Sequence, residues 1–423
     1  MPRPKKIVIE EKQAPVESEE AQGSTLSFRS AVKNTSFDLL AEADELESRM
    51  DTVDGFKSAA EIANSFLPLP QSWMALQYII GRPGIPLNTI VEIMGLETVG
   101  KSSFVCALLG NFMAHNVPCL YLNSEPKVLL SDWRRRLFHT DPNKSAKIDK
   151  LFEKQVYRSV STYNETDKAI REWVQEKRAV LSKDIPLVVA IDSYTKLMNP
   201  EEEETMSWAT SADKKETSLK GVEDISKKPG VTAKWLHQWC RAITPLLRSQ
   251  NVTIIMVAGK AQDQNANPIL PKDAMDKYNK TRPGGTAMNQ SAALQLNLSY
   301  KGAVKQGNDP VAKLIEVYVQ KNSYGPEKRS IIYTLFDNRV ENFNGKDILG
   351  QYIAPAIDMN EALCNLLVAR NVFGMTLTAK RYTSAELNLV RAKPEAVVRA
   401  IYEKQERVLE VAKALSIVGY ELK

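Results

Sequence analysis

Apolar runs of strand length alternate with helical patterns through the middle of this chain. Continuous apolar runs indicate strands buried on both faces, and apolar residues spaced three or four positions apart indicate helices. Strands are predicted at 88–95, 117–123, 156–162, 186–192 and 252–259, and helices at 102–116, 129–138, 165–181 and 233–250. This repeated alternation predicts an α/β fold with a mostly parallel sheet that is covered on both faces.

Three more apolar runs follow, with no helical pattern between them. They predict an antiparallel extension of the same sheet, formed by 292–300, 313–321 and 330–336. Together the two parts form a predicted core at 67–346.

The ends of the chain differ from this core. Residues 1–26 are polar and predict a disordered tail. Within the next segment, 27–66, residues 36–50 have the pattern of an amphipathic helix that packs against another surface. Residues 347–423 become helical and basic again, and predict a small helical C-terminal domain.

Composition excludes several functional classes. The 423 residues contain no apolar run of membrane-spanning length, and the basic N-terminus lacks the apolar stretch of a secretory signal. We therefore expect no association with a membrane and a cytoplasmic location. Four widely spaced cysteines are typical of reduced, buried thiols, and three histidines lack the spacing of zinc ligands. The net charge of +5 is compatible with a polyanionic partner without requiring one.

The stretch "GLETVGKSS" at 95–103 lies between a predicted strand and a predicted helix. Its Gly95, Gly100, Lys101 and Ser102 fit the pattern G-x-x-x-x-G-K-[ST]. In such a loop, backbone N–H groups face the phosphates, the lysine reaches the terminal phosphates and the serine hydroxyl binds Mg²⁺. A chance match in a turn is the alternative. We predict a binding site for ATP and Mg²⁺ made of Gly95, Leu96, Glu97, Thr98, Val99, Gly100, Lys101, Ser102 and Ser103.

Two acidic residues lie at the carboxyl ends of strands, at the same edge of the predicted sheet. Asp192 ends the strand 186–192, where a carboxylate can hold Mg²⁺ together with Ser102, or can simply cap the next segment. Glu125 follows the strand 117–123, where it can orient and polarise an attacking water, or can be a solvated residue at a strand end. We therefore predict Glu125, Lys101 and Asp192 as catalytic residues. Trp133 either stacks on the adenine base or belongs to the core.

In these stretches the chain resembles the RecA-type strand-exchange recombinases, especially their phage (UvsX-like) branch. The resemblance is carried by "GIPLNTIVEIMGLETVGKSSF", "CLYLNSEP", "PLVVAIDSYTKL", "AITPLLRSQNVTIIMVAG" and "TRPGGTAMNQSAALQLNLSYKG", and runs from about residue 64 to 340. It implies a RecA-like P-loop ATPase core, with 27–66 as an N-terminal oligomerisation segment that docks on the adjacent subunit. Packing of the amphipathic helix on its own core is the alternative.

The resemblance also implies a helical filament on single-stranded DNA, with ATP bound between neighbouring subunits and two DNA loops facing the filament axis. By position these loops are 200–232 and 261–290. Basic residues and glycines of such loops can follow phosphates without reading bases, although a solvated lid, or an acidic run that faces another protein, is also compatible. The candidate DNA-binding residues are Lys272, Lys277, Lys280, Arg282, Gly284, Gly285, Lys214, Lys215, Lys227 and Lys228.

Two departures from the family pattern bear on activity. Where the family has a glutamine or histidine that senses the γ-phosphate, at the end of the strand 252–259, this chain has Gly259 followed by Lys260. Where the family supplies two basic residues to the neighbour's nucleotide, Lys321 remains, but Asn322 and Ser323 stand where the second is expected. Lys321 is thus a predicted contact in trans, and hydrolysis is expected to be slow. With Gly259 at the strand end, coupling between ATP and DNA must use another group or be weak.

The leading hypothesis is a DNA-dependent ATPase that assembles on single strands and exchanges them with homologous duplex DNA in recombination and repair. Expected partners are single-stranded and double-stranded DNA, further copies of the chain, a loading mediator and a single-strand-binding protein. If the chain is encoded by a bacteriophage, the location is the host cytoplasm. The alternatives are a ring helicase or other motor ATPase with the same fold, and a filament or scaffold protein that binds ATP with weak hydrolysis.

Overall fold

The computed structural model describes residues 66–114, 117–125, 157–202, 231–259, 261–262, 280–281, 287–306, 309–336 and 357–418, which belong to one compact unit. The predicted tail, nearly all of the N-terminal segment and the predicted helix 129–138 lie outside these residues. No helix in the described part is long and apolar enough to cross a membrane.

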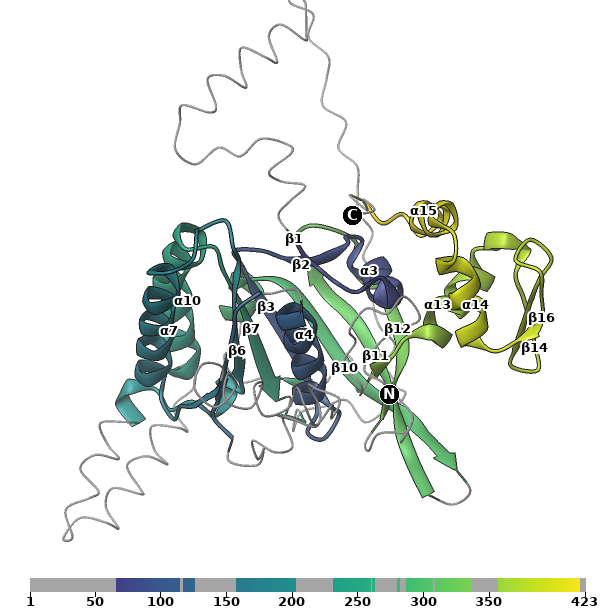
Figure 1. Ribbon diagram of the computed structural model, residues 1–423. Helices are drawn as coiled ribbons and strands as arrows, with labels where there is room; N and C mark the ends of the chain where they lie inside the picture. Colours follow the sequence, from purple (N-terminus) through teal and green to yellow (C-terminus); the bar gives the residue numbers. More distant parts are fainter. Residues whose placement is uncertain are drawn as a thin grey trace, which may run out of the picture. The chain divides into compact units, whose positions relative to one another are not determined.

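A nine-stranded mixed sheet organises the described chain (Figure 1). Its strand order is β13-β12-β11-β10-β3-β7-β6-β4-β5. The strands are β3 (Ile90–Gly95), β4 (Cys119–Asn123), β5 (Tyr157–Ser159), β6 (Leu187–Asp192), β7 (Val252–Gly259), β10 (Ala292–Gln306), β11 (Asp309–Asn322), β12 (Ser330–Phe336) and β13 (Ile357–Asp358). The six strands from β10 to β5 are parallel, and β11, β12 and β13 continue the sheet with antiparallel pairing. The predicted mostly parallel sheet with an antiparallel extension is confirmed.

One strand differs from its prediction. We expected β10 among the antiparallel additions, but it pairs in parallel with β3, with Leu298 opposite Gly95. The helix α12 (Ala287–Ser291) and the segment before it separate β7 from β10, which gives the chain enough length to return to the other end of the sheet. Helix α12 also occupies the end of the stretch 261–290, which we had predicted to be a loop.

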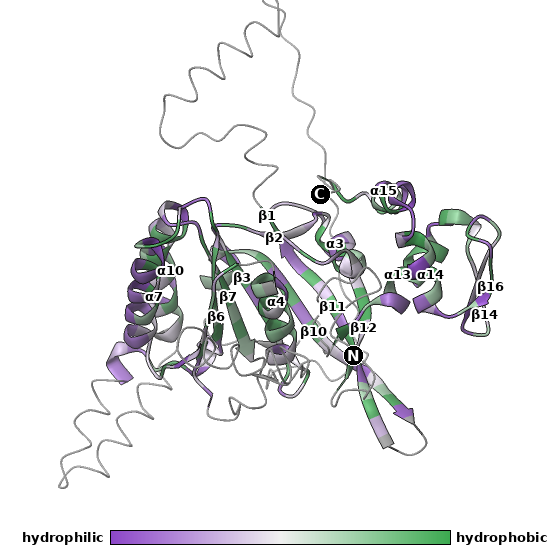
Figure 2. Cartoon of the chain, viewed as in Figure 1, coloured by the Kyte–Doolittle hydropathy of each residue, from purple (hydrophilic) through white to green (hydrophobic). Residues whose placement is uncertain are grey.

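Helices cover both faces of the sheet. On one face lie α4 (Lys101–Ala114) and α3 (Met74–Ile80), which pack against alternate residues such as Val91 and Ile93 of β3. On the other face α7 (Tyr163–Arg178) and α10 (Val231–Ser249) pack against Ile90 and Met94. Figure 2 shows hydrophilic residues along the outer sides of α7 and α10. Successive side chains of β3 therefore pack into two different apolar layers, one on each face of the sheet, as expected for a covered parallel sheet.

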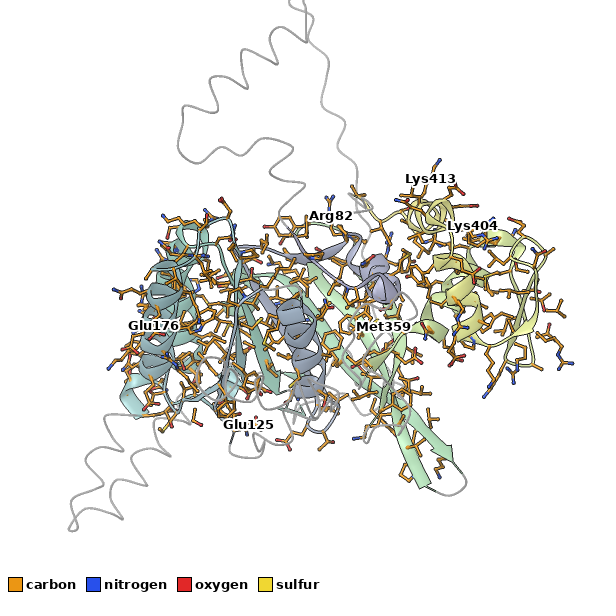
Figure 3. The ribbon with its side chains drawn as sticks, in the orientation of Figure 1. Arg82, Glu125, Glu176, Met359, Lys404 and Lys413 are labelled. Atoms are coloured by element: carbon orange, nitrogen blue, oxygen red, sulfur yellow. The ribbon has the colours of Figure 1, made fainter. Side chains whose placement is uncertain are left out.

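The part of the chain after β13 is not purely helical, which corrects the prediction. Besides α13 (Asn360–Ala369), α14 (Pro394–Tyr402) and α15 (Gln405–Ala414), it contains the antiparallel sheet of β14 (Thr376–Thr378), β15 (Arg381–Ser384) and β16 (Leu389–Ala392). These strands have three or four residues, too few for a clear alternating pattern. Met359 of this part, labelled in Figure 3, is buried in the same apolar cluster as α4. The boundary at residue 346 stays a prediction.

The smaller elements complete the described fold. Strands β1 (Phe66–Pro68) and β2 (Gly84–Pro86) pair with each other, and short helices lie at η1 (Gln71–Trp73), η2 (Tyr194–Lys196) and η4 (Val372–Gly374). Strands β8 (Ala261–Gln262) and β9 (Lys280–Thr281) form a second short pair. All four cysteines of the chain are free and buried.

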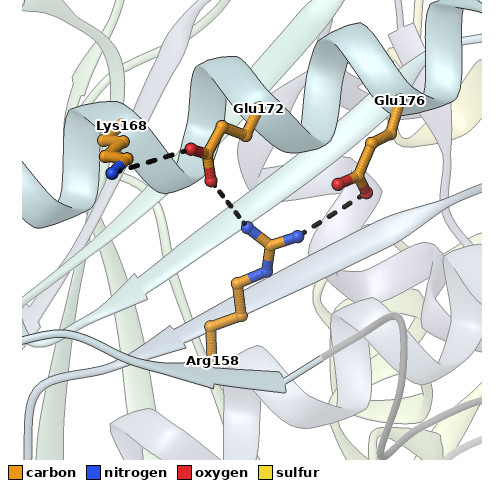
Figure 4. A network of polar contacts seen from close by, with 4 residues as sticks. All are labelled: Arg158, Lys168, Glu172 and Glu176. Atoms are coloured by element: carbon orange, nitrogen blue, oxygen red, sulfur yellow. Dashed lines mark ion pairs between the residues drawn. The ribbon is translucent and has the colours of Figure 1, made fainter.

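A surface network links α7 to the edge strand β5 (Figure 4). Arg158 of β5 forms ion pairs with Glu172 and Glu176 of α7, each at 3.6 Å, and Lys168 pairs with Glu172 at 3.9 Å. The side chains of the acidic partners are 51% and 64% exposed, so water and salt screen these pairs. The network helps to orient α7 and contributes little stability.

Candidate functional site

The glycine-rich loop between β3 and α4 lies at the carboxyl end of β3 and turns sharply. Thr98 and Gly100 have positive φ angles of 60° and 92°. A Cβ atom at Gly95 would lie 2.6 Å from the carbonyl oxygen of Leu298, and one at Gly100 would overlap the side chain of Leu335. Close approach therefore requires glycine at both positions. Positive φ angles in a turn that leads into a helix allow backbone N–H groups to point together at an anion.

Lys101 is the first residue of α4, and its side chain folds back over the loop. Its Nζ donates a hydrogen bond to the carbonyl oxygen of Leu96 at 2.7 Å. Burial lowers the pKa of Lys101, and the nearby carboxylates of Asp192, Glu125 and Glu97 oppose this shift. The ammonium group is therefore close enough to interact electrostatically with Asp192 and Glu125, the two acidic residues predicted from the sequence.

Asp192 ends β6 and is almost fully buried, with 4% of its surface exposed. Its Oδ2 accepts a hydrogen bond of 2.6 Å from the hydroxyl of Tyr121, and the side chain of Ser102 is a second hydrogen-bond partner. Burial raises the pKa of the Asp192 carboxyl, while the hydrogen bonds with Ser102 and Tyr121 act against this effect. The hydroxyl of Ser102 and the carboxylate of Asp192 together form the hard oxygen ligand pair that Mg²⁺ prefers.

Glu125 lies two residues beyond β4, at the same edge of the sheet (Figure 3). Its Oε1 accepts a hydrogen bond of 3.0 Å from the hydroxyl of Ser193, which directly follows β6. The backbone at Glu125 is fixed by Asn123, whose side chain donates to the Glu125 carbonyl oxygen at 2.7 Å and accepts from its N–H at 3.3 Å. The carboxylate is thus oriented from two adjacent strands, and it is only half-buried.

Lys321 lies away from the loop of its own chain. On β11 it is opposite Gln295, which in turn pairs with Glu92, three residues before the end of β3. Three residues of strand correspond to roughly 10 Å. Its Nζ donates to the carbonyl oxygens of Asn289 at 2.5 Å and Ala292 at 2.7 Å. A nucleotide contact by Lys321 would therefore have to be made to a neighbouring copy, which agrees with the sequence interpretation without testing it.

Many predicted contacts lie outside the described residues. These are Trp133, Lys214, Lys215, Lys227, Lys228, Lys272, Lys277, Arg282, Gly284 and Gly285. Lys280 lies in the short strand β9, which pairs with β8. Within the predicted loop 261–290, residues 261–262 therefore pair with residues 280–281.

Sequence reasoning missed several polar residues that surround the acidic pair. Tyr121 bonds Asp192, Ser193 bonds Glu125, and Thr195 contacts both Ser193 and Gly259. The hydroxyl residues that directly follow the strand-end aspartate in "IDSYT" were the available signal. Tyr121 gave none, because an aromatic residue inside a buried strand resembles any other core residue.

Taken together, the described residues form a mixed α/β fold with a large, mostly parallel sheet and a glycine-rich strand–loop–helix unit. A lysine, a serine and two carboxylates meet at the carboxyl edge of that sheet. No protein-family model matches the chain.

Individual proteins do match it. The chain is 22% identical over 268 residues to the mitochondrial DNA repair protein recA homolog of Dictyostelium discoideum, covering 63% of this chain and 49% of that protein. It is 23% identical over 260 residues to Protein RecA of Campylobacter lari, covering 61% and 62% of the two chains. It is 23% identical over 280 residues to Protein RecA of Pseudomonas fluorescens, covering 65% and 66%. The chain thus spans about half to two thirds of these curated relatives, and its fold fits a RecA-like core.

Proposed function

We propose that this protein is a RecA-type recombinase, which binds ATP and Mg²⁺ at residues 95–103, forms a helical filament on single-stranded DNA and promotes strand exchange. The observation that carries the proposal is the convergence of Lys101, Ser102, Asp192 and Glu125 at one edge of the sheet, around a loop whose glycines admit no side chain. The relatives named RecA support a role in recombination or repair in general.

The residues present fit an ATP–Mg²⁺ complex. The backbone of the loop and the ammonium group of Lys101 would hold the phosphates, and Ser102 with Asp192 would hold the metal. Bound Mg²⁺ neutralises phosphate charge. Glu125, half-buried and oriented by Ser193, can accept a proton from a water molecule, as a general base must.

The same residues explain why the site prefers an anion. Burial makes the ammonium group of Lys101 costly to keep charged, and the nearby carboxylates together with the carbonyl oxygen of Leu96 offset part of this cost. A phosphate would satisfy that charge directly. Burial also disfavours the ionised form of Asp192, because it raises the pKa of the carboxyl group. A divalent cation would stabilise that ionised form. The two residues thus complement a bound pair of phosphate and metal.

Binding to DNA and assembly are proposed from the resemblance and from position. The segments 200–232 and 261–290 would face single-stranded DNA, and 27–66 would dock on the next subunit. Lys321 would reach the nucleotide of a neighbour, because its position on the sheet keeps it from its own loop. A loading mediator, a single-strand-binding protein and membership of the phage (UvsX-like) branch complete the proposal, with the host cytoplasm as the location.

Two departures favour a second candidate, a filament protein that retains ATP as a structural ligand. Gly259 has no side chain to sense the nucleotide, and neither Asn322 nor Ser323 can supply the second positive charge beside Lys321. Electron microscopy with ATP and DNA separates the candidates, because a recombinase forms an open helix on DNA, a motor forms closed rings, and a scaffold polymerises without DNA.

The test is ATP hydrolysis with and without single-stranded DNA, comparing the wild-type chain with Lys101→Ala. Lys183→Ala, at an exposed lysine far along the chain from the loop, is the matched control. We expect DNA to stimulate hydrolysis in the wild type and in the control, and Lys101→Ala to abolish it. Hydrolysis that ignores DNA, or that survives in Lys101→Ala, would contradict the proposal.

A further inference from the structure

The short helix η2 connects the acidic edge to the end of β7. Ser193, which precedes η2, contacts Glu125, and Thr195 within η2 contacts Gly259, the last residue of β7. Strand β8 begins two residues after Gly259 and pairs with β9, so the base of the segment 261–281 is anchored directly beyond this contact.

The contacts form one continuous chain of hydrogen bonds. The Gly259 N–H donates to Thr195 Oγ1 at 3.4 Å, Thr195 Oγ1 and Ser193 Oγ lie 3.1 Å apart, and Ser193 Oγ donates to Glu125 Oε1 at 3.0 Å. A hydroxyl has a single proton to donate. Because Ser193 donates to Glu125, it must accept from Thr195, and Thr195 in turn accepts from Gly259. Every donor in the chain therefore points toward the carboxylate.

Two features allow this series of hydrogen bonds to transmit a change from β7 to Glu125. Hydrogen bonds in series polarise one another, so a change at one end alters the strength of the bond at the other. The bond from Gly259 is the longest of the three, close to the limit for an N–H···O bond, and so is the one most sensitive to a shift of the strand end. Among the described residues, an ideal Cβ at Gly259 would meet Thr195 Oγ1, at an ordinary 3.8 Å.

We infer that Ser193 and Thr195 are positioning residues that couple the carboxyl end of β7 to Glu125. Movement of the strand end, when the segment after β7 binds DNA, changes the hydrogen bond that orients the Glu125 carboxylate and thereby changes turnover. The coupling runs through two hydroxyl groups and the backbone N–H of Gly259. This inference rests on the proposed function, because it presumes that Glu125 acts on water and that the segment after β7 meets DNA.

The test measures ATP turnover of the full chain with and without single-stranded DNA in Thr195→Val, Thr195→Ser and Ser193→Ala. Thr244→Val is the matched control, since it removes a hydroxyl that donates to the Cys240 carbonyl oxygen within α10. Loss of one hydrogen bond corresponds to roughly a three- to tenfold fall in DNA-stimulated kcat for Thr195→Val, with KM for ATP within about twofold of wild type. Thr195→Ser, which keeps the hydroxyl, retains the stimulation.

A double variant distinguishes hydrogen bonds that act in series from two contacts that act independently. Ser193→Ala and Thr195→Val break the same chain, so the double variant loses no more stimulation than the larger single effect. Thermal melting confirms that each variant is folded, and Thr195→Ala replaces the valine variant if the larger side chain disturbs η2.

The outcomes are distinguishable. Full DNA stimulation in Thr195→Val, or multiplied losses in the double variant, overturns the coupling while the proposed function stands. A fall of basal and stimulated rates by the same factor in Thr195→Val and Thr195→Ser also overturns it, because that pattern indicates a purely structural role. A wild-type chain that DNA does not stimulate overturns both the proposed function and the coupling.

Discussion

Gly100→Ala tests the geometry of the loop most simply. Gly100 has a φ of 92°, and an added Cβ would overlap Leu335 of β12, which is itself buried in the apolar cluster under α4. Two independent penalties therefore apply to a change of a single methyl group, one from the backbone and one from packing.

The magnitude follows from these two penalties. A positive φ costs a residue with a Cβ about 1–2 kcal/mol, and overpacking a core costs about 1–3 kcal/mol. The free energy of unfolding should fall by about 2–5 kcal/mol. With an unfolding entropy of about 2.1 cal/mol/K per residue, a chain of 423 residues loses roughly 1 °C of Tm per kcal/mol, so Tm should fall by about 2–5 °C.

The assay combines thermal melting with titration of a fluorescent ATP analogue. Gly259→Ala is the matched control, because its Cβ would meet Thr195 Oγ1 at an ordinary 3.8 Å and its φ is not positive. We expect the control to melt within about 1 °C of wild type or slightly higher. Gly100→Ala should also bind the analogue more weakly, since the backbone beside Lys101 must shift. A Gly100→Ala variant with wild-type Tm and affinity would refute this geometry.

Three further predictions concern charge. Asp192→Asn should abolish the Mg²⁺ dependence of nucleotide binding, while its Tm at pH 7 should be at least as high as that of the wild type. The pKa of Asp192 is raised by burial, so the ionised carboxylate destabilises the wild-type fold at a pH above that pKa. The higher Tm of the variant should therefore vanish below about pH 4, where the carboxyl group is protonated in both the folded and the unfolded state. A lower Tm at pH 7 would contradict the assigned cause. Burial lowers the pKa of Lys101, so nucleotide affinity should weaken at alkaline pH earlier than for an ordinary lysine, and should stay flat in Lys101→Arg, as titrations at several pH values would show. Arg158→Ala removes two exposed ion pairs and should change Tm by no more than about 1 °C, a difference that about 1 M salt erases; a larger loss would mean that Glu172 and Glu176 stabilise more than their exposure allows.

The sequence predicted the part of the fold that local pattern determines. The β-branched run before Gly95, the glycine-rich loop and the apolar helix after it identify β3, the loop and α4 without further information. Asp192 and Glu125 were predicted at one edge because the carboxyl ends of parallel strands meet there. Both carboxylates raise the pKa of Lys101, which is consistent with their lying near its ammonium group.

What the sequence could not predict depends on contacts between distant segments. Nothing in "AALQLNLSY" distinguishes a strand parallel to β3 from an antiparallel addition, because both are buried on two faces. The strands β14 to β16 are too short to produce a readable alternation. The contact of Thr195 with Gly259 joins residues 64 positions apart, so only the sheet order of β6 and β7 brings them together.

Strand exchange is the direct test of the proposal that this chain is a recombinase. The measurement follows transfer of a labelled strand from duplex DNA to a homologous single strand that was preincubated with the protein and ATP. A heterologous single strand and the Lys101→Ala variant are the controls. We predict transfer that requires homology, ATP and Lys101. DNA binding and ATP hydrolysis without any homology-dependent transfer would contradict the proposal.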